Sequence, residues 1–199
     1  KIIGIVGENG AGKSTLIRCL CGLQKNRGKF SIGTRKLSAK KLLMRSYLVM
    51  QDVNHQLFTE SVKEEILISV PKSRGEEREK TVDVLLEQMG LTKYSNLHPM
   101  SLSGGQKQRV AVASALASNK DFLFFDEPTS GLDYEHMKAF SEQLKLIKKQ
   151  GATPVVITHD MELLAECCEY LVFITSGKVR WYGRFDKESM NRVMNFFKA

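Results

Sequence analysis

The sequence has no long hydrophobic run. No stretch of about 18 apolar residues, the length that a transmembrane helix needs, occurs in its 199 residues. We also find no internal repeat and no low-complexity segment, which argues against solenoid and linker architectures. With 42% hydrophobic residues, the chain can bury one good core, and we expect one compact α/β domain.

The sequence has few cysteines, and their spacing is not typical of a metal site or of a disulfide scaffold. The chain has four cysteines, Cys19, Cys21 and the adjacent Cys167 and Cys168. None lies in a C-x-x-C arrangement and none lies near a pair of histidines, so the pattern argues against a metal centre and against a disulfide scaffold. We interpret all four as reduced thiols carried by helices.

The charge balance is basic but does not select a partner. Thirty basic and 22 acidic side chains give a net charge of +8. Such a balance suits phosphate ligands, nucleic acid or an anionic membrane face, and it also suits an ordinary basic protein. The lysines and arginines fall into short scattered clusters, so charge alone leaves these alternatives open.

A glycine-rich stretch near the start of the chain carries the strongest signal. It follows the apolar run Ile2–Val6 and precedes a helix-compatible run to Leu20, and it reads Gly7-Glu8-Asn9-Gly10-Ala11-Gly12-Lys13-Ser14-Thr15. This is the pattern GxxxxGK[ST] in the strand–turn–helix context that a phosphate loop requires. A glycine-rich turn that only joins a strand to a helix is the alternative, and the flanking elements argue against it.

Each residue type in this loop has a chemical reason. Glycines let backbone N–H groups turn inward around an anion, and the helix start adds unpaired donors and a positive dipole end. We expect Lys13 to reach the β- and γ-phosphates, the Ser14 hydroxyl to bind Mg²⁺, and Thr15 to lie on the α-phosphate side. This stretch therefore predicts a nucleoside polyphosphate such as ATP, bound together with Mg²⁺.

Apolar periodicity indicates alternating strands and helices along the rest of the chain. Alternation of this kind predicts a largely parallel sheet with helices on both faces, so the polar residues that end the strands should gather at one edge. We read 33–46 as a basic polar link. The expected strands are 28–32, 47–50, 122–125 and 155–157, with a closing hairpin at 171–175 and 179–182; the expected helices are 61–69, 76–89, 103–117, one carrying Met137 to Ile147, one after Met161 and one carrying Met190 to Phe197.

Four polar residues end strands and are candidates for chemistry at that edge. Asp126 can hold Mg²⁺, and Glu127 beside it can polarise the attacking water. His159 can hydrogen-bond the γ-phosphate, and Gln51 can complete the metal shell and touch the water. Each has a structural alternative: the two acids can cap the next helix, the histidine can be structural, and the glutamine can be a solvated strand end.

A second glycine-headed helix start follows at Leu102-Ser103-Gly104-Gly105-Gln106. A serine hydroxyl and exposed glycine amides make it a second anion site in the same chain. One nucleotide already fills the first site, so the second is explained if each chain contacts the nucleotide held by a partner across a two-fold interface. Standing alone, the pentapeptide would read as a serine-capped helix.

These motifs together resemble those of the ATP-binding cassette (ABC) ATPases, the motor domains of ABC transporters. Gly7–Thr15 is similar to the family's Walker A motif, Gln51 to the Q-loop and Leu102–Gln106 to the signature motif. Phe122–Glu127 resembles Walker B with its catalytic glutamate, Ser130–Asp133 the D-loop, and His159 the switch histidine. All six lie in the family's order, and the resemblance covers nearly the whole chain.

The resemblance implies a fold and a site. The fold is an α/β P-loop NTPase, with residues 1–50 and 107–199 as its core and 51–106 as a helical subdomain that carries the signature motif. The implied site is assembled from two copies of the domain. The catalytic residues are Glu127, His159 and Gln51, the metal ligands are Ser14, Gln51 and Asp126, the nucleotide is held by Gly7, Glu8, Asn9, Gly10, Ala11, Gly12, Lys13, Ser14 and Thr15, and the partner contributes Ser103, Gly104, Gly105 and Gln106.

The resemblance also implies partners and a location. We expect a second ABC ATPase domain, a transmembrane coupling subunit and a substrate-binding membrane component, with the chain bound peripherally at the cytoplasmic face of the membrane and no nucleic acid. In the family, antiparallel strands and an adenine-stacking aromatic precede Walker A. We therefore expect an N-terminal antiparallel subdomain to have been truncated before Lys1.

A finer resemblance follows the Q-loop. Gln56-Leu57-Phe58, then Val62-Lys63-Glu64-Glu65-Ile66, is similar to the energy-coupling factor importers, which take up vitamins or transition-metal ions. The alternative is a soluble member of the superfamily acting on ribosomes or DNA. Such proteins usually carry a long insertion in the helical subdomain, and the residues from Gln51 to Ser101 leave no room for one.

Overall fold

The computed structural model describes residues 1–130 and 133–198. The chain divides into two compact units, one formed by Lys1–Leu48 with Asp121–Ala199 and the other by Val49–Lys120. The second unit runs to Lys120, beyond the boundary at residue 106 expected from the sequence. The reason is that the helix that follows the signature motif is continuous from Gly104 to Ala117 and stays in one unit.

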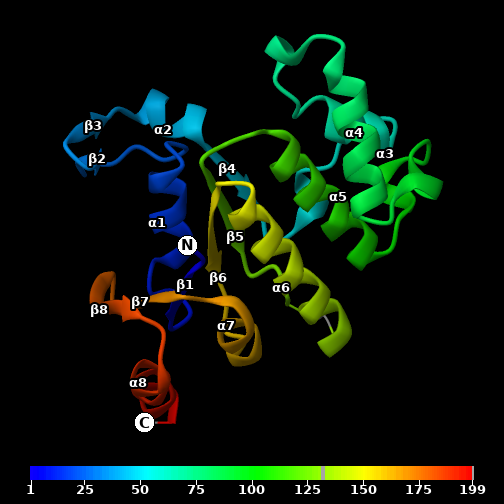
Figure 1. The fold of residues 1–199 in the computed structure, drawn as a ribbon. Coiled ribbons are helices and arrows are strands. Elements are labelled where there is room, and N and C mark those ends of the chain that lie inside the picture. Colours follow the sequence, from blue (N-terminus) through cyan, green and yellow to red (C-terminus); the bar gives the residue numbers. More distant parts are fainter. Residues whose placement is uncertain (131–132, 199) are drawn as a thin grey trace. The chain divides into compact units, whose positions relative to one another are not determined.

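The first unit contains the sheet and most of its helices (Figure 1). Its elements are β1 (Ile3–Gly7), α1 (Lys13–Leu20), β2 (Phe30–Ile32), β3 (Arg35–Leu37), α2 (Ala39–Arg45), β4 (Ser46–Val49, whose last residue belongs to the other unit), β5 (Phe122–Asp126), α6 (Tyr134–Lys149), β6 (Thr153–Ile157), α7 (Met161–Cys167), β7 (Tyr170–Thr175), β8 (Lys178–Arg184) and α8 (Lys187–Lys198).

The main sheet has the strand order β4-β5-β6-β1-β7-β8. Strand β1 lies between two parallel neighbours, with Ile3 opposite Val155 of β6 and Tyr170 of β7. Strand β5 is parallel to β6, and β7 and β8 form the antiparallel hairpin at one edge. The expected α/β class with a largely parallel sheet is therefore confirmed.

Side-chain alternation along β1 and β5 places helices on both faces of this sheet. A side chain on Gly4 would clash with Leu164 and Leu171, so this position lies against α7. Its neighbour Ile5 belongs instead to the cluster that includes α1. On β5, Phe125 meets Phe140 of α6 in an edge-to-face contact with centroids 5.5 Å apart.

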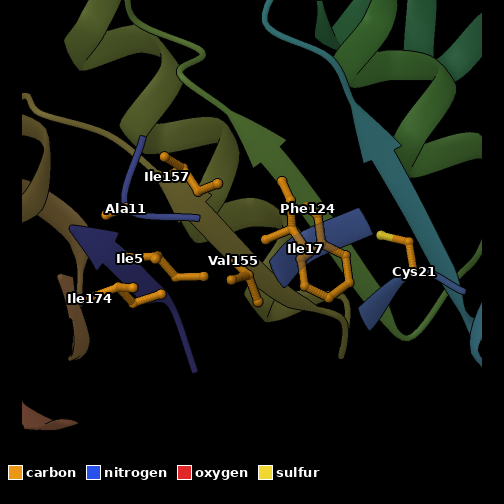
Figure 2. Close-up of a cluster of buried hydrophobic side chains, with 8 residues drawn as sticks. All are labelled: Ile5, Ala11, Ile17, Cys21, Phe124, Val155, Ile157 and Ile174. Carbon is orange, nitrogen blue, oxygen red and sulfur yellow. The ribbon is translucent and has the colours of Figure 1, made fainter. Parts of the chain in front are cut away.

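A buried cluster under the phosphate loop fixes α1 on its face of the sheet (Figure 2). Apolar side chains from four neighbouring strands meet side chains of the loop and of α1, and their burial is the main stabilising contribution here. The cluster consists of Ile5, Ala11, Ile17, Cys21, Phe124, Val155, Ile157 and Ile174. Burial also raises the pKa of the Cys21 thiol to about 12, which keeps it protonated and unreactive.

The segment 33–46, expected as an irregular link, contains β3 and α2. The hydroxyl of Ser38 caps α2 by accepting a hydrogen bond from the Lys41 amide, at 3.4 Å. Only Leu42 of this helix is buried. A single buried position gives no apolar periodicity, which is why the sequence pattern did not reveal the helix.

The second unit is helical. It contains α3 (Val62–Leu67), α4 (Glu77–Gln88) and α5 (Gly104–Ala117), joined through the short turns η1 (Val53–His55), η2 (Lys72–Arg74), η3 (Thr92–Tyr94) and η4 (Pro99–Ser101). The three expected helices in this part of the chain are thus present, each within a few residues of its expected bounds. No helix among the described residues is long and apolar enough to span a bilayer.

Candidate functional site

The phosphate loop joins β1 to α1 and owes its shape to glycine. Gly10 and Gly12 have φ of 79° and 95°, a left-handed backbone that other residues rarely adopt. A side chain on Gly7 would overlap the carbonyl oxygen of Ile174 on β7. The loop is closed by a hydrogen bond from the Ala11 amide to the Glu8 carbonyl and is fixed to the β7–β8 turn by one from Gly177 to the Ala11 carbonyl, both 3.1 Å.

The start of α1 leaves a set of backbone donors unused. In the part of the chain that the structure describes, the amides of Gly12, Lys13, Ser14 and Thr15 donate to no protein acceptor. Gly12, at the N-cap, offers no side-chain cap either. A helix start with four unpaired N–H groups suits an anion, which is what the glycine pattern predicted.

Lys13 lies across this loop and is only 7% exposed. Its ammonium donates to the carbonyls of Gly7 and Glu8, at 2.7 and 3.0 Å. Burial lowers the pKa of Lys13 below 10.5, and the nearby carboxylates of Glu127 and Asp126 oppose that shift. The Lys13 ammonium is thus held beside the loop, with the carboxylates of Glu127 and Asp126 nearby.

Ser14 and Asp126 meet although they are 112 residues apart, with the serine hydroxyl donating to a carboxylate oxygen at 3.2 Å. A hydroxyl and a carboxylate are oxygen ligands of the kind that Mg²⁺ prefers, and Mg²⁺ takes its remaining ligands from phosphate and water. No group of three or more His, Cys, Asp or Glu suited to a metal occurs among the described residues. As oxygen donors, Ser14 and Asp126 fit a magnesium ion that takes its other ligands from a nucleotide and from water.

Glu127 and His159 lie within hydrogen-bond distance at the ends of β5 and β6, with Oε1 and Nε2 2.9 Å apart. The backbone of Glu127 has φ of 48°, and its amide donates to the Ile157 carbonyl at 3.0 Å. The same Nε2 lies 3.5 Å from the Lys13 ammonium. An Nε2 that donates to the carboxylate cannot also accept from Lys13, so the histidine tautomer decides which of the two contacts is a hydrogen bond.

The other two sequence candidates belong to the second unit. Gln51 follows β4 and is exposed. The chain after it is held by side chains: Asp52 accepts from the Asn54 amide at 2.9 Å, and Lys107 of α5 donates to the Asn54 side chain at 2.9 Å. The residues behind the Q-loop candidate are therefore tied to the helix that begins at the signature motif.

The signature segment forms the start of α5 with a complete capping box. The hydroxyl of Ser103 accepts from the Gln106 amide at 3.4 Å, and the Gln106 side chain accepts from the Ser103 amide at 2.8 Å. Ser103 and Gly104 are exposed. A side chain on Gly104 would meet nothing within 4 Å, so no local packing requires glycine there.

The carboxylate of Glu65 is buried, and no role for it was predicted from the sequence. It is 3% exposed and accepts from the amides of Phe58 and Thr59 at 2.9 and 3.0 Å and from the Thr59 hydroxyl at 2.9 Å. Its own carbonyl accepts from Ser114 of α5 at 3.2 Å. Glu65 is the second glutamate of the Val62-Lys63-Glu64-Glu65-Ile66 motif. Its hydrogen bonds anchor the segment that follows the Q-loop.

Of the predicted D-loop, Gly131 and Leu132 lie outside the described residues. Asp133 caps α6, its carboxylate accepting from the His136 amide at 2.9 Å.

Comparison with known families gives the same assignment. The ABC transporter model matches residues 1–130 of the chain. The chain belongs to the ABC transporter ATPase family.

Curated relatives of this ABC ATPase domain carry corresponding names. A "Putative ABC transporter ATP-binding protein" of Treponema denticola is 44% identical over 180 residues, covering 90% of this chain but 36% of the relative. A second, from Archaeoglobus fulgidus, is 36% identical and covers 98% of this chain and 69% of the relative. The "Probable amino-acid import ATP-binding protein YxeO" of Bacillus subtilis is 31% identical, with 100% and 86% covered. The chain thus spans about a third of the Treponema protein.

Solved structures agree on the fold. The cbiO1 protein from Clostridium perfringens, described as part of the ABC transporter complex cbiONQ, superposes with a TM-score of 0.81 at 28% identity, covering 98% of this chain and 83% of that one. The ATP-binding cassette MJ0796, in a dimeric post-hydrolysis state bound to ADP and Pi, superposes with a TM-score of 0.76 at 30% identity, with 94% and 86% covered.

Proposed function

We propose that this domain is the ATP-hydrolysing motor of an ABC importer. The observation that carries the proposal is the convergence of Lys13, Ser14, Asp126, Glu127 and His159 at the carboxyl edge of the sheet beside a phosphate loop. These are the groups that phosphoryl transfer to water needs: donors for the phosphates, oxygen ligands for a metal, and a carboxylate for the water.

Binding of the triphosphate would use the unpaired amides at the start of α1 and the Lys13 ammonium. Because Lys13 is buried, its charge acts on the phosphates with little screening by solvent. Mg²⁺, when held by Ser14 and Asp126, would neutralise phosphate charge and orient the γ-phosphate. The Asp126 carboxylate remains close to Ser14 and keeps its hydroxyl aimed at the site.

Glu127 is the proposed group that polarises the attacking water. Its side chain is 16% exposed, so water reaches it, and its carboxylate is held by His159 at 2.9 Å. An Nε2–H donated to Glu127 fixes the orientation of that carboxylate. When nucleotide binds, we expect His159 to contact the γ-phosphate and so to align the water with it.

The start of α5 is the proposed cover for a nucleotide held by a second cassette. Its exposed Ser103 and Gly104 and the amide of Gly105 present donors and a positive dipole end, and Gln106 secures the cap. In such a dimer, each copy would supply Ser103, Gly104, Gly105 and Gln106 to the other. The dimeric MJ0796 structure supports a two-cassette arrangement for this domain.

We further propose energy-coupling factor import of a vitamin or a transition-metal ion. The likeness to cbiO1 and the Gln56–Phe58 and Val62–Ile66 motifs support it, and the name of YxeO supports import more generally. A transmembrane coupling subunit would then dock near the Q-loop, beside a substrate-binding component, with this domain bound at the cytoplasmic face of the membrane.

The substitution Glu127→Gln tests the hydrolysis step. We expect ATP affinity within about twofold of the unchanged protein and a loss of turnover of about a hundredfold to ten-thousandfold, because the amide cannot accept a proton from water. The ATP-loaded variant should accumulate as a dimer. Phosphate release and light scattering measure both effects.

Glu77→Gln is the matched control, since Glu77 is an exposed glutamate in the first turn of α4. It should hydrolyse ATP at the unchanged rate. A Glu127→Gln protein that remains monomeric with ATP and releases phosphate quickly would contradict the proposed role.

A further inference from the structure

The positive charge of this protein comes from one stretch of the chain. Residues 9–51 contain ten basic side chains and no acidic one, whereas the other 156 residues contain 20 basic and 22 acidic side chains. Of the ten, Lys13 serves the phosphate loop and Arg45 pairs with Asp121. The remaining eight are exposed and are Arg18, Lys25, Arg27, Lys29, Arg35, Lys36, Lys40 and Lys41.

None of these eight cations has a carboxylate partner within the described residues. By contrast, other basic residues of this protein, such as Lys63, Lys145 and Arg192, form ion pairs with neighbouring acids. The eight cations therefore repel one another with no internal compensation, which lowers stability in the isolated protein. An anionic partner would remove this cost.

The local fold places the segments that carry these side chains next to one another. The β2–β3 hairpin and α2 lie side by side beyond the C-terminal end of α1 (Figure 1). A side chain on Gly22 would lie 3.1 Å from the Leu43 amide, so the end of α1 is packed directly on α2. We call the exposed side chains of residues 18–45 the basic face.

The basic face is separate from the nucleotide site. At about 1.5 Å of rise per residue, the eight residues of α1 make a helix about 12 Å long, with the phosphate loop at one end and the basic face starting at the other. The cations of the basic face are therefore available to something other than the nucleotide.

Aliphatic side chains lie among the cations. Leu23 is 57% exposed, Ile32 39% and Leu43 48%, and Met44 beside Leu43 is also exposed. On α2, Leu42 points into the protein while Lys40, Lys41 and Leu43 are exposed, so one short helix presents both charge and hydrocarbon outward. In the hairpin, Ile32 stands opposite Arg35 in the register.

We propose that the basic face binds directly to the anionic surface of a lipid bilayer. Lysines and arginines next to such a surface gain favourable interaction with its headgroups, and interleaved leucine and isoleucine side chains can enter the boundary between headgroups and acyl chains. Nucleic acid also attracts cations, but it gives exposed aliphatic side chains no apolar environment. The mixture of charge and aliphatic side chains therefore favours lipid.

The test is co-sedimentation of the protein with vesicles of phosphatidylcholine alone and of phosphatidylcholine with phosphatidylglycerol. Binding should require phosphatidylglycerol and weaken as salt is added. In the variant with Arg35, Lys36, Lys40 and Lys41 all changed to Gln, the partition coefficient should fall about fivefold per cation, several hundredfold in total. ATP affinity should be unchanged, which shows that the variant is folded.

A matched control removes the same charge elsewhere. Lys72, Lys80, Lys138 and Lys149 are exposed lysines outside the basic face, and changing all four to Gln should leave vesicle binding within about threefold. Leu43→Asn should weaken binding about tenfold, whereas Val84→Asn, at an exposed position of α4, should not change it.

Three outcomes would overturn the proposal. One is no binding to phosphatidylglycerol vesicles. Another is an equal loss of binding in the two quadruple variants, because total charge rather than the basic face would then be responsible. The third is binding to polyadenylate or polyglutamate without binding to vesicles, which would indicate a nucleic-acid or an acidic-protein partner instead.

Discussion

Helices α1 and α5 both start at a glycine-rich segment, and they differ in what satisfies their first amides. At α1, Gly12 offers no side-chain cap, the first amides have no protein acceptor in the described part of the chain, and a buried lysine and two acids stand close by. At α5, Ser103 and Gln106 cap the helix reciprocally, and Gly104 remains exposed. The first start combines unpaired amides with a buried cation and two nearby carboxylates, whereas the second is a capped helix end whose glycine is exposed.

The starts of α1 and α5 are both glycine-rich, but only the start of α5 is expected to need a second chain for its role. Changes at the start of α1 should act on nucleotide binding by one chain. Changes at the start of α5 should leave that binding intact and act only when two chains meet.

Lys13→Ala should weaken ATP binding by about a hundredfold or more, because a buried charge–phosphate contact is lost from the loop. Isothermal titration calorimetry measures the affinity, and Lys149→Ala, at an exposed lysine, is the control. Retention of full affinity in the Lys13 variant would show that the loop amides alone hold the triphosphate.

Ser103→Asp should separate the two helix starts most sharply. Aspartate caps a helix as well as serine does, so folding and ATP binding should be unchanged. The added negative charge would repel a phosphate held by the partner, and turnover should fall about tenfold to a hundredfold with loss of the ATP-dependent dimer. Ser61→Asp, at the N-cap of α3, provides the matched cap control. Normal turnover and dimerisation in the Ser103 variant would refute the proposed contact.

Glycine-to-alanine changes should have unequal effects on the free energy of unfolding at the two sites. Gly12 has φ of 95°, so Gly12→Ala should lower the free energy of unfolding by about 1–2 kcal/mol. Gly104 needs no positive φ and a Cβ there meets nothing, so Gly104→Ala should change it by less than about 1 kcal/mol. Urea denaturation of both variants measures the difference. Similar destabilisation by both would mean that α5 carries backbone strain absent from this structure.

The smallest effect is a pH dependence confined to the first site. Burial lowers the pKa of Lys13 below 10.5, so in the free protein Lys13 loses its proton at a lower pH than an ordinary lysine. Because ATP binds the protonated form better, affinity should fall as pH rises from 8 to 10, and more steeply than for an ordinary lysine, since the Lys13 pKa is lowered by burial. The fall should be absent in Lys13→Met. Calorimetric affinities across this pH range, with the same slope in both proteins, would contradict the assignment.

Much of the fold and of the candidate site follows from local sequence. The GxxxxGK[ST] pattern after an apolar run located the phosphate loop, and continuous apolar runs that lead into polar residues located the strands at Asp126 and before His159. The sequence did not predict helix α2 because Leu42 is its one buried residue, so the helix shows no apolar periodicity. The sequence did not predict the anchoring role of Glu65. Its carboxylate accepts from the backbone amides of Phe58 and Thr59 and from the Thr59 hydroxyl, and contacts of this kind produce no recognisable sequence pattern.

The sequence by itself determined both helix starts, because a glycine-rich turn and a serine cap are properties of a few consecutive residues. Only the tertiary structure decided which distant groups meet: Ser14 with Asp126, and Glu127 with His159. The physical reason is the parallel order of β1, β6 and β5, which brings the carboxyl ends of strands far apart in the chain to one edge, where charge and burial then fix each pair.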